Sequence, residues 1–404
     1  ESGTQFDSDD VLPEFGMGSQ IGPYLLQKKI GKGGMGVVFF APQDVPIQRL
    51  VALKIIKPRL DSEKIVGRFE TERKTLALMD HPNIAKVLDA GTTASGLPYF
   101  VMELINGKRI DRFCDEHHLT IVDRLKLSIE ICRAIQHAHQ KGIIHRDLKP
   151  SNILIADCDG TPVVKVIDFG VAKAVSPTLA DHSISTQFGF LVGTFEYMSP
   201  EQAGIDRQDV DTRSDIYSLG AVLYELLAGR TPFEKERIRK AGLDDLLKMI
   251  AGEEPPTLSS TLETNPDSPT IARFRNTTPA KLELQLKGDL DWIVSKALAK
   301  DPGQRYESTD ALISDLNRHL QDEPVSAGPP TAAYKFRKFC RRNKSLLAFM
   351  IVAGFLLAAG TAISAALAVR AHRAEKLARG FLEDANQNLR LARQATHEAN
   401  VARL

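Results

Sequence analysis

The chain lacks a charge excess of either sign, because 52 lysine and arginine residues oppose 51 aspartate and glutamate residues and leave a formal net charge of +1. Proteins dedicated to nucleic acid normally carry a strong basic excess or patch, so we expect no nucleic-acid partner. Cysteine is also scarce: there are four, and none forms a CxxC pair. This pattern fits reduced structural thiols in a cytosolic main domain better than a disulfide framework.

Residues 1–20 lack an apolar period and are polar and turn-rich, which predicts a flexible lead-in. The 404-residue chain, which is 43% hydrophobic and 25% charged, is long enough for a two-lobed globular domain with additional elements. The chain starts at Glu1 rather than at methionine and ends inside a helical pattern. We therefore expect it to be a piece of a longer protein.

The stretch from His145 to Asn152 (HRDLKPSN) places a carboxylate, an ammonium and an amide within six positions. These groups belong to Asp147, Lys149 and Asn152. Phosphoryl transfer needs such groups to orient a hydroxyl, neutralise a phosphate and hold a divalent metal. The apolar run 163–167 then predicts a strand that leads to a second carboxylate, Asp168, in the sequence Asp-Phe-Gly.

Upstream, a glycine-rich turn over residues 31–36 lies between two predicted strands, where backbone N–H groups can close over phosphates without side-chain obstruction. By itself, such a turn is more often an ordinary hairpin. Lys54 lies inside an apolar strand, and a buried lysine needs a partner. Glu72, on an amphipathic helix predicted over residues 61–80, is the best candidate, with Glu70 as its competitor.

Four stretches hold these features: the glycine-rich turn 31–36, the strand that holds Lys54, residues 145–152 and residues 168–170. In this order and spacing, they resemble the signature set of a eukaryotic-type (Hanks-type) protein kinase. The chain looks like a bacterial membrane-anchored serine/threonine kinase, and residues 288–294 and 301–306 more narrowly resemble a group abundant in planctomycetes. The resemblance covers residues 22–345. It implies an α+β, two-lobed protein kinase fold, with a β-rich N-lobe over residues 21–104 and an α-helical C-lobe over residues 105–320.

The resemblance also implies roles for individual residues. Asp147 would accept or orient the substrate hydroxyl, Lys149 would steady the transferring phosphoryl group, and Lys54, paired with Glu72, would anchor the α- and β-phosphates of ATP. The implied ligands of Mg²⁺, with Mn²⁺ as an alternative ion, are Asn152 and Asp168. The implied ATP contacts are Ile30, Gly31, Lys32, Gly33, Gly34, Met35, Gly36, Val37, Val38, Ala52, Lys54, Met102, Glu103, Ile105 and Leu154. Apart from the resemblance, the apolar members of this set are ordinary core residues.

Lys149, two residues after Asp147, resembles serine/threonine kinases, since tyrosine kinases generally have Ala-Ala-Arg or Arg-Ala-Ala at this place. Thr194 is implied to hydrogen-bond Asp147 and Lys149 and to shape the substrate pocket. Two departures from the family pattern follow it. Phe195 replaces a common proline, which can alter the preferred substrate, and Ser199 stands where many kinases have alanine.

The 28 residues between Gly170 and Ser199 are rich in hydroxyl groups, and loops of this length are usually functional or disordered. Arg146 is placed to pair with a phosphate in this loop and so to order it. The candidate phosphosites, in order of preference, are Thr186, Ser185 and Ser183. A solvent-exposed loop without a switch is the alternative.

Apolar periods predict helices over residues 121–140, 216–227 and 243–250, and the rest of residues 234–290 is predicted to be a connection rich in proline, serine and threonine. His137 and His139 are two positions apart and therefore lie on different helix faces, so we interpret them as packing or surface residues rather than metal ligands. By resemblance, Asp215 is a buried aspartate that hydrogen-bonds the catalytic-loop backbone, and Arg305 forms a structural ion pair with Glu201.

Residues 321–345 form a linker whose basic part, 335–344, holds six lysines and arginines. Residues 346–369 carry no charge and extend about 36 Å as a helix, which suffices to span a bilayer; a buried core helix is the alternative. The six basic residues before the span exceed the four in residues 370–379. This bias predicts a cytoplasmic kinase and an extracytoplasmic segment over residues 370–404.

Small residues recur every four positions in the span, at Gly360, Ser364 and Ala368, and such a face can pair two helices into a homodimer. Alanine-rich spans also produce this spacing by chance. Residues 370–404 show an amphipathic helical pattern that is typical of the start of a coiled coil or a repeat array.

The sequence thus predicts an enzyme that uses ATP and Mg²⁺ to phosphorylate serine or threonine in protein substrates, with activation-loop autophosphorylation, in membrane-linked signalling. Two other classes remain: a catalytically silent membrane scaffold that uses nucleotide binding as a signal, and a small-molecule phosphotransferase similar to aminoglycoside kinases. The intact Asp147, Asn152 and Asp168 argue against the scaffold. Thr194 and Glu201 argue against the small-molecule enzyme.

Overall fold

The computed structural model describes residues 15–33, 36–45, 47–57, 79–169, 195–203 and 210–401. The chain divides into two compact units, residues 1–331 and residues 332–404. The first unit contains an antiparallel sheet followed by a helical lobe, and the second consists of two helices.

The strands of the N-terminal lobe are β1 (Gln20–Ile21), β2 (Tyr24–Leu25), β3 (Lys28–Gly33), β4 (Gly36–Gln43), β5 (Arg49–Ile56), β6 (Val87–Thr92) and β7 (Pro98–Glu103). Hydrogen-bonded neighbours run β1-β2-β4-β5-β7-β6, with β3 paired to β4. On β5, Leu53 and Ile55 are fully buried in the core of this lobe. Because successive side chains of a strand point to opposite faces, Lys54 points to the other face of the sheet, with Val38 and Phe100 as its register neighbours.

A smaller sheet joins β8 (Gly107–Arg109), β9 (Ile153–Cys158) and β10 (Thr161–Val166). The β9–β10 hairpin turns at Asp159 and Gly160, both at positive φ (53° and 81°), as the common two-residue hairpin turn requires. The N–H of Ile167 donates to the carbonyl of Asn152 (2.9 Å). The hairpin therefore holds Asn152 beside the segment that leads to Asp168.

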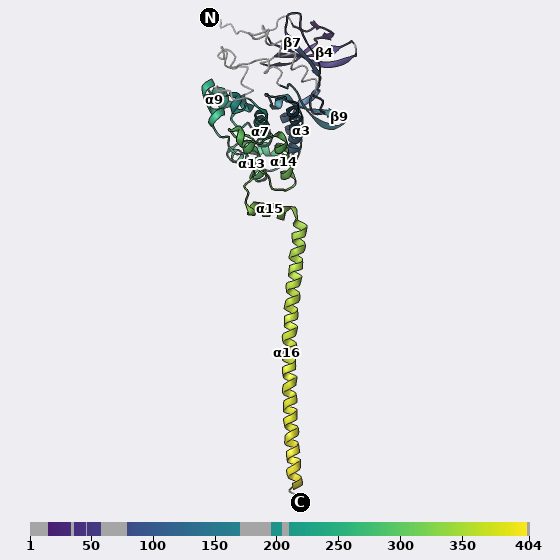
Figure 1. Cartoon of the computed structure of the whole chain (residues 1–404), viewed down its shortest axis with the longest axis vertical. Coiled ribbons are helices and arrows are strands. Elements are labelled where there is room, and N and C mark those ends of the chain that lie inside the picture. Colours follow the sequence, from purple (N-terminus) through teal and green to yellow (C-terminus); the bar gives the residue numbers. More distant parts are fainter. Residues whose placement is uncertain are drawn as a thin grey trace. The chain divides into compact units, whose positions relative to one another are not determined.

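The helical lobe packs around two long helices, α3 (Ile121–Gln140) and α7 (Thr212–Ala228), with α13 (Asp289–Ala297) and α14 (Thr309–Leu320) beside them (Figure 1). The prediction of a helix over residues 121–140 is confirmed, and Thr120 caps it by accepting a bond from the N–H of Asp123 (3.2 Å). Helix α7 begins four residues earlier than predicted, because the side chain of Asp211 caps it by accepting from the N–H of Arg213 (2.7 Å).

The helix predicted over residues 243–250 is confirmed by α9 (Leu243–Gly252), but the connection predicted for the rest of residues 234–290 was wrong, because four further helices lie there. The helices there are α8 (Lys235–Lys240), α9 (Leu243–Gly252), α10 (Leu258–Thr264), α11 (Ser268–Phe274) and α12 (Pro279–Leu286). Four of the five have six to eight residues, which is too short for a clear apolar period. Their formation depends on tertiary contacts, such as those of the buried Leu258 and Leu282 with the core of the lobe. The remaining short elements are α2 (Ile110–Glu116), α6 (Pro200–Ala203), and the 3₁₀ turns Pro150–Asn152, Phe195–Tyr197 and Pro302–Gln304.

The segment after α14 is fixed to the helical lobe by one buried carboxylate. Asp315, which has no exposed surface, accepts hydrogen bonds from the N–H and hydroxyl of Ser326 (2.7 and 2.8 Å), the N–H of Ala327 (2.9 Å) and the hydroxyl of Tyr306 (3.0 Å). Burial of Val325 completes this attachment. The first compact unit accordingly extends to residue 331.

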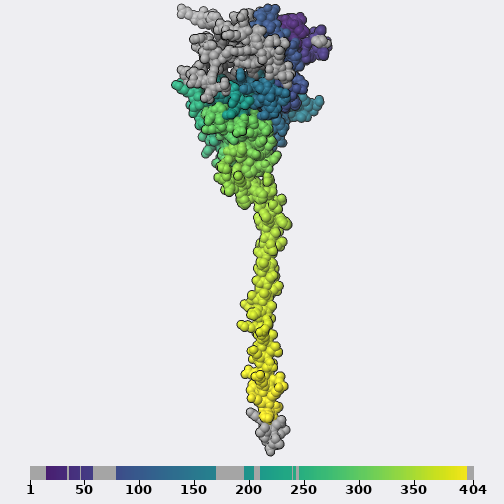
Figure 2. Space-filling model, in the orientation of Figure 1, coloured from purple at the N-terminus to yellow at the C-terminus, as the bar shows by residue number. Residues whose placement is uncertain are grey.

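The second unit contains α15 (Ala332–Arg342) and α16 (Lys344–Val401), so much of the basic linker is helical and the apolar residues 346–369 lie within a longer helix. Among the described residues, α16 is the one helix long and apolar enough to cross a membrane, with a mean hydropathy of 2.4 in its most apolar window, of which 0% is buried. Figure 2 shows the side chains of α16 forming the surface of a single helix.

Candidate active site

Asp215, at the start of α7, holds the backbone of the loop of residues 145–152, which carries the predicted catalytic residues. This fully buried carboxylate accepts from the N–H groups of His145 and Arg146 (both 2.8 Å) and from Nε2 of His139 (2.8 Å). These bonds support Arg146 in a left-handed conformation (φ 63°), which costs energy for a residue other than glycine. Asp215 thus lies where the sequence predicts, and His139, which we interpreted as packing or surface, takes part in the same network.

Two predicted catalytic side chains, Lys149 and Asn152, converge on the carboxylate of a third, Asp147. The ammonium of Lys149 lies 2.9 Å from Oδ2 of Asp147, and Nδ2 of Asn152 donates to the carbonyl (2.8 Å) and to Oδ2 (3.1 Å) of Asp147. The side chains of Lys149 and Asp147 are 21% and 10% exposed. Asp147 is therefore oriented by the loop itself and remains within reach of solvent.

His145 connects this loop to the segment of the second carboxylate. Its ring is buried, and burial lowers its pKa, although the carboxylates of Asp215 and Asp147 oppose this change. Because the carbonyl of Ile167 can only accept, Nε2 carries the proton toward it (3.1 Å), and Nδ1 accepts the N–H of Asp147 (3.3 Å). The ring also packs against Phe169, with centroids 4.6 Å apart. A neutral histidine thus connects Asp147 to Ile167 and Phe169, which flank Asp168.

The strand lysine meets the second carboxylate. Nζ of Lys54 lies 2.8 Å from Oδ1 of Asp168, and the two side chains are 13% and 23% exposed. Asp168 adopts a left-handed backbone conformation (φ 59°), which turns it out of the line of β10. The structure therefore pairs Lys54, which the resemblance assigns to the phosphates of ATP, with Asp168, which the resemblance assigns to the metal ion.

Asn152 and Asp168 offer the oxygen ligands that Mg²⁺ and related hard cations prefer. The amide nitrogen of Asn152 makes both side-chain hydrogen bonds given above, toward Asp147. The amide oxygen is then the atom left to act as a ligand, and Asp168 adds carboxylate oxygens. This donor set fits a divalent metal.

The described ATP-contact candidates lie on β3, β4, β5, β7 and β9, except for Ile105, which lies between β7 and β8. Ala52 pairs with Met102 across β5 and β7, and Val38 pairs with Lys54 across β4 and β5, so these residues line up from strand to strand. Val37 instead contributes to the core of the N-lobe. A Cβ atom at Gly36 would lie 2.2 Å from the carbonyl oxygen of Ile55. Close approach of two strands therefore requires glycine at this position, whether or not phosphate binds there.

The carboxylate of Glu103 serves the connection between the lobes. It lies 2.9 Å from Nζ of Lys165 on β10 and accepts from the N–H of Lys86 (3.2 Å). Its own N–H donates to the carbonyl of Lys86 (2.9 Å). The side chain of Glu103 therefore braces the connection between β7 and β10.

Several predicted residues lie outside the described residues. They are Glu72, Gly34, Met35, Thr186, Ser185, Ser183 and Thr194. Ile30, Gly31, Lys32 and Gly33 are described on β3, and Ile30 is exposed.

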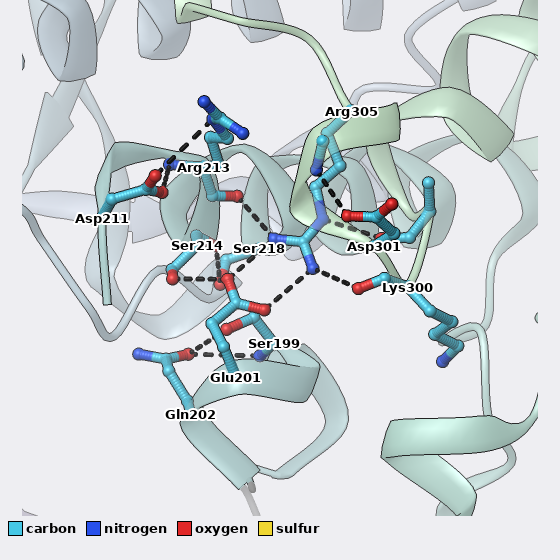
Figure 3. A network of polar contacts seen from close by, with 12 residues as sticks. Ser199, Glu201, Gln202, Asp211, Arg213, Ser214, Ser218, Lys300, Asp301 and Arg305 are labelled. Carbon is cyan, nitrogen blue, oxygen red and sulfur yellow. Dashed lines mark hydrogen bonds and ion pairs between the residues drawn. The ribbon is translucent and has the colours of Figure 1, made fainter. Parts of the chain in front are cut away.

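A buried ion pair between Arg305 and Glu201 is drawn in Figure 3. Arg305 binds Glu201 through two contacts, Nη1 to Oε1 (2.7 Å) and Nη2 to Oε2 (2.8 Å), and Ser214 donates to the same carboxylate (2.5 Å). Burial opposes ionisation of Glu201, but the hydrogen bonds from Arg305 and Ser214 outweigh it and lower the pKa of this carboxyl group. The predicted pair is confirmed.

Sequence reasoning missed Gln202, the neighbour of Glu201 on α6. Its Nε2 donates to the carbonyl of Arg146 (2.9 Å), and its Oε1 accepts from the N–H (3.1 Å) and hydroxyl (3.2 Å) of Ser199. Gln202 therefore joins the loop of residues 145–152 to α6, the helix that carries Glu201 of the buried pair. The one indication of this role in the sequence is that Gln202 directly follows Glu201.

The fold and the converging polar groups define a protein kinase domain, and residues 24–316 match the family described as "Protein kinase domain". The chain belongs to this family, and the predicted two-lobed kinase fold is confirmed. Protein kinases use ATP and a divalent metal ion. The kinase domain of Mycobacterium tuberculosis PknI shares the fold, with a TM-score of 0.53 and 23% sequence identity over 76% of this chain and 99% of that one.

Bacterial serine/threonine kinases are among the relatives of the chain. The chain is 37% identical over 309 residues to serine/threonine-protein kinase PknB of Mycobacterium tuberculosis, covering 75% of this chain and 44% of that protein. It is 33% identical over 316 residues to a probable serine/threonine-protein kinase of Clostridium perfringens, covering 76% of this chain and 40% of that protein. The chain thus spans less than half the length of these relatives.

Proposed function

We propose that this chain transfers the γ-phosphoryl group of ATP to serine or threonine hydroxyls of proteins. The hydroxyl oxygen attacks the γ-phosphorus, the bond from that phosphorus to the β,γ-bridging oxygen breaks, and ADP leaves with the bonding electron pair. The hydroxyl proton passes to the carboxylate of Asp147. Such a reaction depends on positioning and charge neutralisation more than on covalent catalysis.

One observation carries the proposal: Lys149 and Asn152 both bind Oδ2 of Asp147. The two contacts fix the carboxylate in one orientation, so that it can receive a proton from a hydroxyl placed beside it. Lys149 also brings a positive charge to the point where negative charge develops on the phosphoryl oxygens.

On the other side, Lys54 and Asp168 form a partly exposed ion pair that can exchange partners. Lys54 would bind the α- and β-phosphates, and Asp168 with Asn152 would hold Mg²⁺, with Mn²⁺ as a substitute. The metal supplies positive charge that offsets the phosphate oxygens. Ile30, the glycine turn, Ala52, Met102, Ile105 and Leu154 would surround the nucleotide.

The remaining roles are proposed on the resemblance alone. Thr194 would position the acceptor, and Glu72 would pair with Lys54 in the active state. Thr186, Ser185 and Ser183 are the proposed autophosphorylation sites, with Arg146 as the partner of the phosphate. The narrower affinity to planctomycete kinases stays a prediction.

We also propose that residues 346–369 span the cell membrane once, with the kinase in the cytoplasm and residues 370–404 outside. The support is the apolar, unburied helix α16 and the excess of basic residues before the span. In this arrangement the enzyme would take part in membrane-linked signalling. Pairing of two spans through Gly360, Ser364 and Ala368 would give a homodimer.

The test uses the full chain reconstituted in lipid vesicles with ATP labelled in the γ-phosphate, Mg²⁺ and a basic acceptor protein. We expect label on serine or threonine and none on tyrosine. The Asp168→Asn variant serves as the matched control, because it keeps the size of the side chain and removes the charge needed for the metal. Nucleotide binding without transfer in the parent chain would contradict the proposal and favour the silent scaffold.

A further inference from the structure

Helix α15 has two chemically different faces. At 3.6 residues per turn, Phe336, Phe339 and Cys340 fall within an arc of roughly 100°. Phe336 is 65% exposed and Phe339 is 43% exposed. The two buried residues of the helix, Tyr334 and Lys338, lie on the opposite face. An aromatic stripe is therefore presented away from the buried side of the helix.

Basic side chains border this aromatic stripe. The exposed ones are Lys335, Arg337, Arg341, Arg342 and, at the start of the next helix, Lys344. Residues 332–344 contain no acidic residue. Long basic side chains can lay their methylene groups along an apolar surface and extend their charge to its edge. The pattern is that of a helix that lies in the headgroup region of a membrane.

The place of α15 in the chain supplies the second argument. It ends at Arg342, and α16, with its apolar residues 346–369, begins at Lys344 (Figure 1). If residues 346–369 enter the bilayer, as proposed above, then α15 is held within a few residues of the headgroups. A basic and aromatic helix at that position meets anionic lipid phosphates on the same side of the membrane.

We propose that α15 binds the surface of anionic membranes, with Phe336 and Phe339 inserted below the headgroups and the flanking lysines and arginines bound to lipid phosphates. The inference rests on the proposed membrane span. It assigns a lipid-binding role to a segment that would otherwise be a passive linker.

Tryptophan fluorescence in the full chain tests this contact. Phe339→Trp and, as a control on the kinase unit, Leu284→Trp are reconstituted in vesicles of acyl-brominated phosphatidylcholine, with or without phosphatidylglycerol. Leu284 is 72% exposed on α12. The parent chain, whose single tryptophan is Trp292, provides the background. A further control, Leu357→Trp, reports whether the span is inserted.

We expect bromine to quench Trp fluorescence of the Phe339→Trp variant, more strongly when phosphatidylglycerol is present, and to leave the Leu284→Trp variant at background. Combining Phe339→Trp with Lys335→Gln, Arg337→Gln, Arg341→Gln and Arg342→Gln should abolish the dependence on anionic lipid. Equal signals for Phe339→Trp and Leu284→Trp, while Leu357→Trp is quenched, would overturn the proposal. So would quenching that is the same in both lipid mixtures. Failure of Leu357→Trp to be quenched would instead disprove the span and, with it, this inference.

Discussion

Two arginine–glutamate pairs in the helical lobe have the same geometry but very different surroundings. Arg305 and Glu201 form two parallel contacts of 2.7 and 2.8 Å, and Arg237 and Glu253 form two of 2.6 and 2.8 Å. The first pair is 0% and 9% exposed, and the second is 55% and 43% exposed. Burial rather than distance decides what each pair contributes, because water screens the exposed pair and competes for its hydrogen bonds.

The pairs of the active site lie between these extremes. The side chains of Lys54, Asp168, Asp147 and Lys149 are 10% to 23% exposed. These side chains are buried enough for strong electrostatic interactions. They are also exposed enough that each can release its present partner and bind phosphate or metal instead. A fully buried pair cannot do so without leaving a desolvated charge. The comparison therefore predicts that buried charges control stability and that partly exposed ones control chemistry.

The largest effect on stability is expected for Glu201→Gln. The change leaves the buried guanidinium of Arg305 without its counter-charge, and loss of one partner of a buried pair costs about 3–5 kcal/mol. Denaturant titration of the full chain should show this decrease in the free energy of unfolding. Since the pKa of Glu201 is lowered in the folded state, the contribution is present above the ordinary carboxyl pKa and is lost as the pH falls through the folded-state value.

A double variant controls for the loss of side-chain shape. Glu201→Gln with Arg305→Met removes both charges, so it should recover part of the stability lost in the single variant. If the double variant is less stable than the single one by a full additional increment, the two residues act independently and the burial argument is wrong.

The next largest effect is expected for Asp215→Asn. An amide offers one acceptor oxygen where the carboxylate offers two, so a buried N–H of His145 or Arg146 loses its partner, at a cost of about 1–3 kcal/mol. The transfer rate should also fall, because the same bonds place Asp147. The exposed Asp310→Asn, on α14, is the control. Unchanged stability and rate in Asp215→Asn would show that the loop does not depend on this carboxylate.

A similar but more local effect is expected for Asp315→Asn, which loosens the segment around Ser326. Burial opposes ionisation of Asp315, but the hydrogen bonds from Ser326 outweigh it, followed by those from Ala327 and Tyr306, and lower the pKa. Its contribution is therefore present above the unfolded carboxyl pKa of about 3.9 and is lost as the pH falls through the lower folded-state value. Amide hydrogen exchange at Ser326 and Ala327 should accelerate in the variant, and identical protection would contradict the attachment.

The smallest effect is expected for Glu253→Gln. The substitution removes the negative charge of the exposed pair Arg237–Glu253 and keeps the size of the side chain. Denaturant titration should give the same free energy of unfolding as for the parent chain, within error. A decrease in the free energy of unfolding as large as that of Glu201→Gln would show that burial does not decide what the two pairs contribute.

The sequence was most informative where chemistry requires a residue type at a short spacing. Asp147, Lys149 and Asn152 fall within one loop, and the structure brings them together. Contacts between distant segments were harder to predict: Gln202 reaches Arg146 across 56 positions, and His139 reaches Asp215 across 76. Lys54 illustrates the same limit, because the sequence names Glu72 as its partner and does not indicate the ion pair that Lys54 forms with Asp168.

Secondary structure followed the same rule. Helix α3 has a long apolar period and a capping threonine, so the sequence predicts its bounds. Helices α10 to α12 have seven or eight residues each and form because the core of the lobe covers them. The chain pattern of such short helices carries too little information to separate them from loops.

The most direct test of the account measures the phosphoryl-transfer rate and the free energy of unfolding for one variant, Asp147→Asn, in the same vesicle preparation. We expect the rate to fall by about 10²–10⁴-fold, the usual cost of losing a positioned base, while the free energy of unfolding changes little, because this partly exposed carboxylate serves chemistry. A parent-like rate, or a loss of activity that merely parallels a loss of stability, would contradict the assignment of Asp147 as the catalytic group.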